Sequence, residues 1–425
     1  MSINTTKLFN KSFTIMSVGQ FISLFGNSLQ RFALSLLILD LTGSAKIFSI
    51  IIAVTFVPQI LLSPFGGAIA DRFSKKWIMV LLDTISCGIL FIFFLLFSQT
   101  QNISWLAIGI LMFVLTIIQS IYDPSVRASI PAVTSQDNLS SANSVVSIIS
   151  SITGLLGPIA GGFLYGMYGI ETILLINTIS FLFSAIMELF LVIPFAAKEL
   201  TENVLATFWS DIKGTCTYLI HEKPIIFKTI LISSSINLFL APIYSVGMPF
   251  MEKIIFGVSN ELYGISEGFV GAGMIIGAVL AGVVAKKYPF AKMHVYFYTI
   301  ILLVAVMGIC GLPIILGTSG PSYVSYVLFT ASGFLFAAIL AVVNILCMTY
   351  MQMEIPMAHM GKCMALIIAM SNALFPVGQL IFGVLYDTFA SATWFIYILV
   401  GLCTIVITVI MQSTIRKAFP ATTEA

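Results

Sequence analysis

Three acidic residues, Asp83, Glu188 and Glu267, interrupt long apolar stretches of this 425-residue chain. If such stretches cross a membrane, each charged group costs about 2.5–3.5 kcal/mol on insertion scales and usually has a partner or a function. A buried carboxyl can bind and release a proton or form an ion pair. All three are therefore candidates for proton coupling. Glu267 could instead pair with Arg31, either glutamate could be structural, and for Asp83 we favour a structural network near the cytoplasm.

Four polar residues near the amino terminus share one face of a predicted helix. Gln20, Ser23, Asn27 and Arg31 follow one another at spacings of three, four and four residues, and such residues lie above one another on a helix. A stripe of this kind can face water and form hydrogen bonds to a small molecule. Alternatively, the long side chain of Arg31 reaches outward to the lipid headgroups.

The overall composition indicates the solvent in which these stretches fold. Charged residues make up 8% of the chain and apolar residues 59%, whereas soluble domains contain about 25% charged residues. The mean hydropathy is +1.09. Because so little charge cannot cover a water-exposed surface of this size, we expect an integral membrane protein. The net charge of +2 gives no electrostatic reason to expect binding of nucleic acid.

Apolar stretches of roughly 20 residues, long enough to cross a bilayer, recur along the sequence. They predict an all-α, polytopic membrane protein with twelve transmembrane helices in two six-helix bundles. The predicted helices lie at 13–39, 48–70, 77–97, 104–122, 140–165, 170–193, 225–250, 261–285, 293–312, 323–350, 362–386 and 393–412. A polar segment divides the chain into an N-terminal bundle over 1–195, a cytoplasmic linker over 196–223 and a C-terminal bundle over 224–425.

Basic residues are distributed unevenly between alternate loops. If the amino terminus lies in the cytoplasm, all but three of the 19 basic residues fall on the cytoplasmic side. Lys46 and Lys253 then lie outside, and Arg31 lies within a helix. Cytoplasmic loops of membrane proteins carry an excess of Lys and Arg. The pattern predicts that both termini are cytoplasmic and that the protein spans the cell (inner or plasma) membrane several times.

Two short sequence similarities relate the halves of the chain. Gly67-Ala-Ile-Ala70 corresponds to Gly282-Val-Val-Ala285, and Gly162-Phe-Leu-Tyr165 corresponds to Gly383-Val-Leu-Tyr386. Each separation is close to half of the chain length. The similarities indicate a six-plus-six duplication, an arrangement by which many transporters form a binding site between their repeats.

The segment after the second predicted helix resembles a family signature. It reads Gly67-Ala-Ile-Ala-Asp-Arg-Phe-Ser-Lys-Lys-Trp-Ile78 and is similar to the loop 2–3 signature of the major facilitator superfamily, apart from a serine where that signature has its second glycine. The resemblance implies a cytoplasmic gate between two rocking halves. Five residues of the segment would form it, namely Gly67, Asp71, Arg72, Lys75 and Lys76. The alternative is that the basic residues only fix the topology.

A second motif lies within the fifth predicted helix. Gly157-Pro158-Ile-Ala-Gly161-Gly162 resembles the core of the antiporter motif of exporters in this superfamily, and the resemblance implies export. Small residues allow close helix packing, and proline bends a helix because it lacks an N–H donor. The match covers only the core, since Thr153 replaces a glycine of the longer motif. Ordinary close packing is the alternative interpretation.

The fourth predicted helix departs from a pattern of proton-coupled superfamily members. These often carry R-x-x-Q-G, whereas this chain reads Thr116-Ile-Ile-Gln119-Ser120, without the arginine. The following segment, Tyr122-Asp-Pro-Ser-Val-Arg-Ala-Ser-Ile-Pro131, and the exit of the first helix, Leu39-Asp-Leu-Thr-Gly-Ser44, are similar to the branch of macrolide efflux proteins and the enterobactin exporter. This resemblance implies outward movement of small organic molecules.

The family resemblance also implies which residues line a substrate cavity, because helices 1, 4, 7 and 10 converge on it in the superfamily. The polar residues at these places are Gln20, Ser23, Asn27, Arg31, Gln119, Asn237, Tyr326 and Asn344. A cavity with these side chains would be mostly apolar and nearly uncharged. It would suit amphipathic molecules better than sugars or phosphates.

Together these observations predict a secondary active transporter that exports small amphipathic organic molecules, such as drugs, macrolides or siderophore-like compounds, by alternating access. We expect coupling to a proton gradient, no bound cofactor, and a monomer whose partners are its substrate and membrane lipid. Uptake, a lipid or lysolipid permease of the same fold, and a non-transporting membrane receptor are the alternatives.

The sequence lacks the motifs that would indicate an ATP-driven pump, a zinc-dependent hydrolase of the H-E-x-x-H type or a C-x-x-C metal site. Neither a G-x-x-x-x-G-K-[ST] stretch nor an H-E-x-x-H motif occurs in it. The six cysteines include no C-x-x-C pair, and the three histidines lie far apart in the sequence. We therefore expect a protein that is not an enzyme and has no catalytic residues and no metal ligands.

Overall fold

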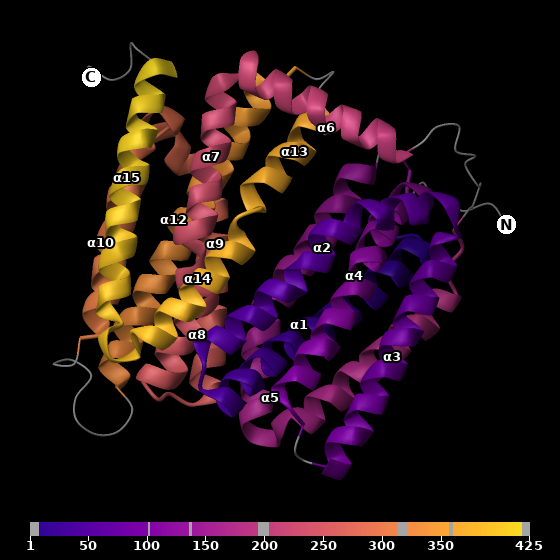
Figure 1. The fold of residues 1–425 in the computed structure, drawn as a ribbon. Coiled ribbons are helices and arrows are strands. Elements are labelled where there is room, and N and C mark those ends of the chain that lie inside the picture. The colour runs from indigo at the N-terminus through magenta and orange to yellow at the C-terminus, as the bar shows by residue number, and fades with distance from the viewer. Residues whose placement is uncertain are drawn as a thin grey trace. The chain divides into compact units, whose positions relative to one another are not determined.

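The computed structural model describes residues 8–100, 103–135, 138–193, 204–312, 322–356 and 360–418. These residues form helices that pack into two compact units (Figure 1). The first unit takes the described residues of Met1–Gly43, Val54–Glu199 and Ser259–Gly268. The second unit takes those of Ser44–Ala53, Leu200–Val258 and Phe269–Ala425.

The first unit consists mainly of five helices, coloured indigo to magenta in Figure 1. They are α1 (Lys11–Thr42), α2 (Ala45–Arg72), α3 (Lys75–Thr100), α4 (Trp105–Val133) and α5 (Leu139–Leu189). α5 packs along both α1 and α3, and α4 contacts the same two helices. The start of α2 belongs to the second unit, whereas the start of α9 (Asn260–Lys287) belongs to the first.

Two glycines with positive φ, Gly43 and Gly169, separate consecutive helices of the first unit. Gly43 has φ 59° and ends α1, and its N–H donates to the carbonyl of Leu39 at 2.8 Å. Gly169 has φ 74° and ψ −178° within α5, a combination that is open essentially to glycine alone. α5 is therefore two consecutive helices, and its break separates the predicted helices at 140–165 and 170–193.

The second unit contains the remaining helices. Its long elements are α6 (Val204–His221), α7 (Pro224–Phe239), most of α9, α10 (His294–Cys310), α12 (Tyr323–Glu354), α13 (Met360–Asn372), α14 (Phe375–Thr388) and α15 (Trp394–Ala418). α7 continues through short turns, which are η2 (Ile243–Gly247), α8 (Met248–Phe250) and η3 (Met251–Ile255). Two further turns are η4 (Phe290–Lys292) and η6 (Ala390–Ala392). α10 packs on α12 and α15, and α7 packs on α13, α14 and α15.

The described helices account for the twelve predicted membrane crossings. Nine of the helical stretches within the described residues are long and apolar enough to span a bilayer, and one of them, Ser141–Leu189, contains the break at Gly169. Two shorter apolar stretches, Ala45–Gln59 and His294–Cys310, supply the other crossings. The prediction of an all-α protein with twelve membrane helices is confirmed.

Several helix boundaries differ from those expected. α4 continues to Val133, through the segment predicted as a loop after Tyr122. Pro124 leaves the Ser120 carbonyl without its helical N–H donor, but proline is tolerated in membrane helices because neighbouring groups and local adjustments compensate for the missing bond. The predicted linker 196–223 likewise contains a helix, α6, over most of its described length.

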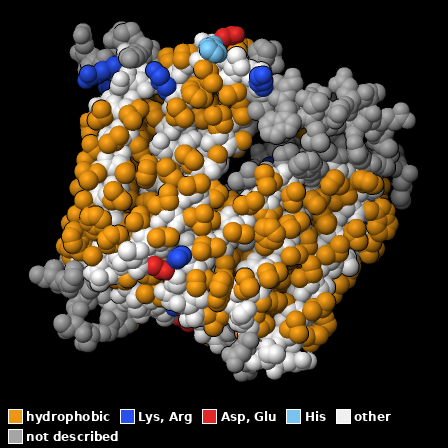
Figure 2. Space-filling view, in the orientation of Figure 1, with side chains coloured by type: hydrophobic (Ala, Val, Ile, Leu, Met, Phe, Trp, Pro, Cys, Tyr) orange, Lys and Arg blue, Asp and Glu red, His pale blue; other side chains and the backbone are white. Residues whose placement is uncertain are grey.

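Large hydrophobic side chains lie on the outside of the helices. Leu61, Ile110, Val279, Leu302 and Val409 are each more than half exposed. In Figure 2, hydrophobic side chains dominate the described surface on the face shown, and the visible Lys and Arg side chains lie mostly near its upper edge. A surface of this kind is stable in contact with lipid, because lipid does not penalise exposed apolar groups.

Candidate functional site

The polar stripe of α1 runs from the interior of the first unit to its surface. Gln20 and Ser23 are 7% and 3% exposed, Asn27 is half-buried and Arg31 is exposed. The Ser23 side chain faces the hydroxyl of Tyr122 on α4. Inside the first unit, the stripe therefore continues into polar groups of neighbouring helices.

A chain of hydrogen bonds connects α1 to α4. Nδ2 of Asn27 donates to Oε1 of Gln119 at 3.2 Å, and Nε2 of Gln119 donates to Oδ1 of Asp123. The Asp123 carboxyl also interacts electrostatically with Arg127 and Arg31. The structure thus brings predicted cavity residues together and adds Asp123. The sequence did not identify this residue because an Asp-Pro pair is typical of a helix end rather than of a helix interior.

Two of the three coupling candidates lie together inside the first unit. Asp83 on α3 is 2% exposed and Glu188 on α5 is 1% exposed, and their carboxyl groups interact electrostatically. The Tyr122 hydroxyl donates to Oε1 of Glu188 at 2.7 Å. Because these residues come from three different helices, no sequence spacing could have predicted the cluster.

The third coupling candidate, Glu267, lies on the part of α9 that belongs to the first unit. It is 9% exposed, and its Oε1 accepts a hydrogen bond of 2.7 Å from the Tyr263 hydroxyl, one turn earlier. The Tyr263 ring stacks on Phe32 of α1, with ring centroids 5.1 Å apart. Glu267 is thus associated with the contact between α1 and α9.

The glycines of the antiporter motif make close contacts with α1. A Cβ atom added to Gly157 would lie 2.3 Å from Ser28 Oγ and 2.6 Å from Ser28 Cβ. One added to Gly161 would lie 3.0 Å from the carbonyl oxygen of Leu29. Any larger residue at Gly157 would therefore separate α5 from α1.

The same motif also packs against the start of α9. A Cβ atom on Gly162 would lie 2.6 Å from the Asn260 carbonyl oxygen and 2.7 Å from Gly264 Cα. In turn, one on Gly264 would lie 2.9 Å from the Pro158 carbonyl oxygen. Backbone approaches this close require glycine on both helices. The motif is therefore a packing seam with one side on α1 and the other on α9.

A hydrogen-bonded group around Asp40 extends this seam. The Tyr165 hydroxyl of α5 donates to Oδ2 of Asp40 at 3.0 Å. Nδ2 of Asn260 donates to the same oxygen at 3.5 Å. The Asp40 carboxylate, in the segment by which the chain leaves the first helix, thus joins α1, α5 and α9.

The predicted gate segment forms a tight connection between α2 and α3. The N–H of Ile78 donates to the carbonyl of Ser74 at 3.0 Å, so the helical bonding of α3 begins directly after the turn. The side chains of Gly67, Asp71 and Arg72 lie outside the described part of the structure. Their role in a gate remains a prediction.

The two lysines of the gate segment begin α3. Lys75 is half-buried. The Lys76 amine donates to the carbonyl of Leu189, the last residue of α5, at 2.6 Å. A cation is favourable at that position because the last carbonyls of a helix carry partial negative charge. Lys76 therefore joins α3 to the end of α5 within the first unit.

In the second unit, the predicted cavity residue Asn237 supports a broken helix. Its Nδ2 donates to the carbonyl of Ser371 at 2.9 Å, and the neighbouring Ser234 Oγ donates to the carbonyl of Met370 at 2.8 Å. These carbonyls lie just before the interruption between α13 and α14. Side chains that satisfy freed backbone groups make such breaks tolerable within a membrane.

Tyr326 of α12, another predicted cavity residue, faces a buried carboxyl that the sequence did not single out. The Tyr326 side chain interacts with Glu252 and Thr330, and Thr330 Oγ1 donates to Oε1 of Glu252 at 3.4 Å. Glu252 is fully buried, at 0% exposure. The last predicted cavity residue, Asn344, is exposed.

The sequence predicts a loop at Glu252, because the predicted seventh helix ends at residue 250. Two π-helical turns instead carry this helix onward to Ile255. Such turns often occur at functional sites, because they redirect side chains that a regular helix would place elsewhere. In the sequence, the neighbouring charges of Glu252 and Lys253 are typical of a surface loop, and they gave no indication of a buried carboxyl.

Asp387 at the end of α14 is a second carboxylate in the second unit that the sequence did not single out. Its Oδ2 accepts from Ser44 Oγ at 2.5 Å, and its Oδ1 accepts from the Ala45 N–H at 2.6 Å. Carboxylates stabilise helix starts because the first N–H groups there have no partner within the helix. Asp387 therefore caps α2.

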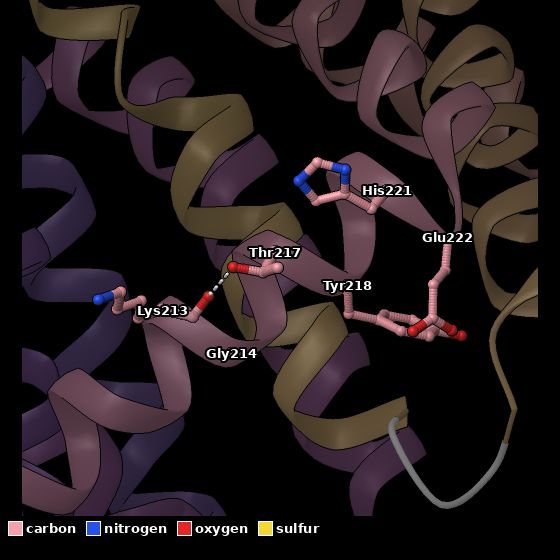
Figure 3. Close-up of a pocket in the computed structure, with 6 residues that line it drawn as sticks. All are labelled: Lys213, Gly214, Thr217, Tyr218, His221 and Glu222. Carbon is pink, nitrogen blue, oxygen red and sulfur yellow. Dashed lines mark hydrogen bonds between the residues drawn. The ribbon is translucent and has the colours of Figure 1, made fainter.

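The linker helix α6 bears a separate hollow of about 460 Å³. Figure 3 shows its lining, with the Tyr218 and Glu222 side chains close together and Lys213 at the other end. The residues around it are Lys213, Gly214, Thr217, Tyr218, His221 and Glu222. None of these residues belongs to the predicted cavity or to the buried acidic cluster.

Comparison with known proteins gives the family. A family model described as Major Facilitator Superfamily matches residues 16–378. The chain is similar to the staphyloferrin A transporter of Staphylococcus aureus, with 23% identity over 94% of this chain and 95% of the relative. It is also similar to macrolide efflux protein A of Streptococcus pyogenes, with 21% identity over 96% and 97% of the two chains.

Solved structures agree on the fold. A bacterial homologue of the iron transporter ferroportin in an inward-facing state has a TM-score of 0.71 at 14% identity, covering 95% of this chain and 98% of that one. Its similarity concerns the fold alone. Together with the family model, the twelve apolar crossings and the glycine seam of α5, it supports one conclusion: this chain is a membrane transporter that belongs to the Major Facilitator Superfamily.

Proposed function

We propose that this transporter exports small amphipathic organic molecules by alternating access, in exchange for protons, from a cell membrane with both of its termini in the cytoplasm. The observation that carries the proposal is the α5 seam, in which the residues of the antiporter motif pack against α1 and α9. The named relatives include a macrolide efflux protein and a siderophore transporter, so these two compound classes are the first candidates for substrates.

The chemistry of the buried side chains supports an organic rather than a strongly charged substrate. In the first unit, the half-buried amides of Asn27 on the α1 stripe and Gln119 on α4 bond to one another. Amides and hydroxyls can exchange such bonds for bonds to a substrate at little net cost. The other residues of α1 and α4 are mostly apolar, as a mainly hydrophobic ligand requires.

Transport polarity in oriented vesicles tests the proposal. Everted vesicles with an acidic lumen should accumulate a labelled macrolide or staphyloferrin A, and a protonophore should abolish at least nine-tenths of the accumulation. Vesicles without the protein are the control. Accumulation in right-side-out vesicles under an inward proton gradient would instead establish uptake.

A second measurement separates coupling from direction. If everted vesicles accumulate the compound equally well with and without a proton gradient, export stands and proton coupling fails. Purified protein in liposomes without ATP should retain the gradient-driven transport, because no nucleotide-binding stretch occurs in the sequence.

A further inference from the structure

The buried carboxyls Asp83 and Glu188 present an electrostatic problem that the fold does not solve with a cation. Both lie in the interior of the first unit and interact with each other. Among the described residues, neither carboxyl forms an ion pair. Two buried carboxylates close together cannot both remain charged without a compensating positive charge.

The hydrogen bonds around the pair leave room for one more donor. Tyr122 donates to Oε1 of Glu188, but Oε2 of Glu188 and Oδ2 of Asp83 have no hydrogen-bond partner among the described residues. The Ser184 hydroxyl, which is 0% exposed, faces the Asp83 carboxyl from one turn before Glu188 on α5. An unbonded buried acceptor costs about 1–3 kcal/mol, so a bound hydrogen would stabilise this cluster.

Few other titratable or charged groups face the pair. The Cys87 thiol on α3 and the Tyr122 hydroxyl on α4 are within its electrostatic reach. α1 contributes the neutral side chain of Ser23, which faces Tyr122. Lys76 donates its amine to the carbonyl of Leu189, the residue that follows Glu188, and not to either carboxyl.

We propose that Asp83 and Glu188 together form a proton-binding site of the first unit, which holds one proton shared between the two carboxyls. Its part in transport rests on the proton coupling proposed above. In the step, one carboxylate accepts a proton from hydronium and becomes a carboxylic acid, releasing water. The reverse step returns the proton to water, and no electrons are exchanged. Tyr122 is a positioning residue that donates to Glu188.

Infrared titration of the purified protein in liposomes tests proton binding directly. The carbonyl stretch of a protonated carboxylic acid should be present in the wild type at pH 7, with an intensity equivalent to one group from this pair. That intensity should be lost in the double variant Asp83→Asn/Glu188→Gln. Glu171→Gln, which removes an acid on the same helix, is the matched control and should leave the band unchanged.

A conservative variant keeps the test valid if the double variant fails to fold. Tyr122→Phe removes the hydrogen bond that favours the charged form of Glu188. The midpoint of the infrared titration should then move to higher pH, whereas a merely structural role would leave it in place. An unshifted midpoint would overturn the proposal. So would a wild-type band that appears only after Na⁺ is removed, since the pair would then bind Na⁺.

Transport assays distinguish failure of this inference from failure of the proposed function. If gradient-driven efflux persists unchanged in Glu188→Gln and in Asp83→Asn, the exporter stands and the pair is not its proton site. If the infrared band is lost in the double variant but wild-type efflux does not depend on the proton gradient, the proton site is supported and the coupling proposal fails. We expect the gradient-driven component of efflux to fall at least tenfold in both variants.

Discussion

The polar side chains of α1 and α7, the helices that begin the two predicted six-helix bundles, bond to different kinds of partner. α1 begins the first set of predicted helices and α7 begins the second. On α1, Asn27 bonds to another side chain, Gln119. On α7, Ser234 and Asn237 bond to backbone carbonyls next to the break between α13 and α14.

The difference concerns which bonds can change during a transport cycle. A bond between two side chains can be exchanged when a substrate or a proton arrives, because rotamers reorient at low cost. A bond to a backbone carbonyl beside a helix break is better kept, because few other donors can replace it in an apolar solvent. The α1 face is therefore suited to binding, and the α7 face to holding a broken helix in place.

Separating α1 from α5 should have the largest effect on stability and transport. Gly157→Val places a side chain where a Cβ atom already lies 2.3 Å from Ser28 Oγ, so α1 must move or the protein must misfold. Overpacking of this kind costs about 1–3 kcal/mol or more. We expect a lower unfolding temperature in detergent and loss of transport. Gly154→Val is the control, because a Cβ atom there meets nothing within 4 Å, and an equal loss in it would refute the seam.

Removing the Tyr122 hydroxyl should have the next largest effect on stability. Tyr122→Phe deletes the 2.7 Å bond to Glu188 and leaves a buried acceptor unbonded, at a cost of about 1.5–3 kcal/mol. Chemical unfolding followed by tryptophan fluorescence would measure the difference. Tyr298→Phe removes the hydroxyl of an exposed side chain, which accepts a hydrogen bond from Gln412, and should cost much less. If both variants lose the same stability, the buried bond to Glu188 does not explain the effect of Tyr122→Phe.

Breaking the α7 support should have a moderate effect on stability. Asn237→Leu removes the donor to the Ser371 carbonyl, which is worth about 0.5–1.5 kcal/mol for a neutral pair. We expect faster hydrogen exchange around the α13–α14 break, with the exchange of the first unit unchanged. If the main result is a changed substrate affinity with unaltered exchange, Asn237 belongs to the binding site and the comparison with α1 fails.

The smallest effect is expected at the entrance to α7. Lys223 precedes this helix and forms an ion pair of 3.4 Å with Glu354, in which the side chains are 30% and 45% exposed. Solvent screens such a pair, so Lys223→Ala should cost about 0–1 kcal/mol. Thermal unfolding at low and high salt would measure it, and a large salt-sensitive loss would show that this contact matters more than its exposure indicates.

The sequence alone determined the membrane environment and the helix count. Apolar stretches of spanning length satisfy their own backbone groups as helices, so their number follows from local composition. The glycines of the α5 motif likewise signalled a close contact, because small residues at helical spacing have few other uses. The boundaries at Asp123 and Glu252 were wrong, because proline and acidic residues favour loops unless neighbouring helices supply partners.

Only the tertiary structure decided which buried polar groups meet. Asp83, Tyr122 and Glu188 lie on three helices, and a pairing between distant helices depends on how each helix is rotated and how closely it packs. The same holds for the cap that Asp387 provides for α2. Local sequence gives each polar residue its chemistry, whereas its partner is fixed by packing along the whole chain.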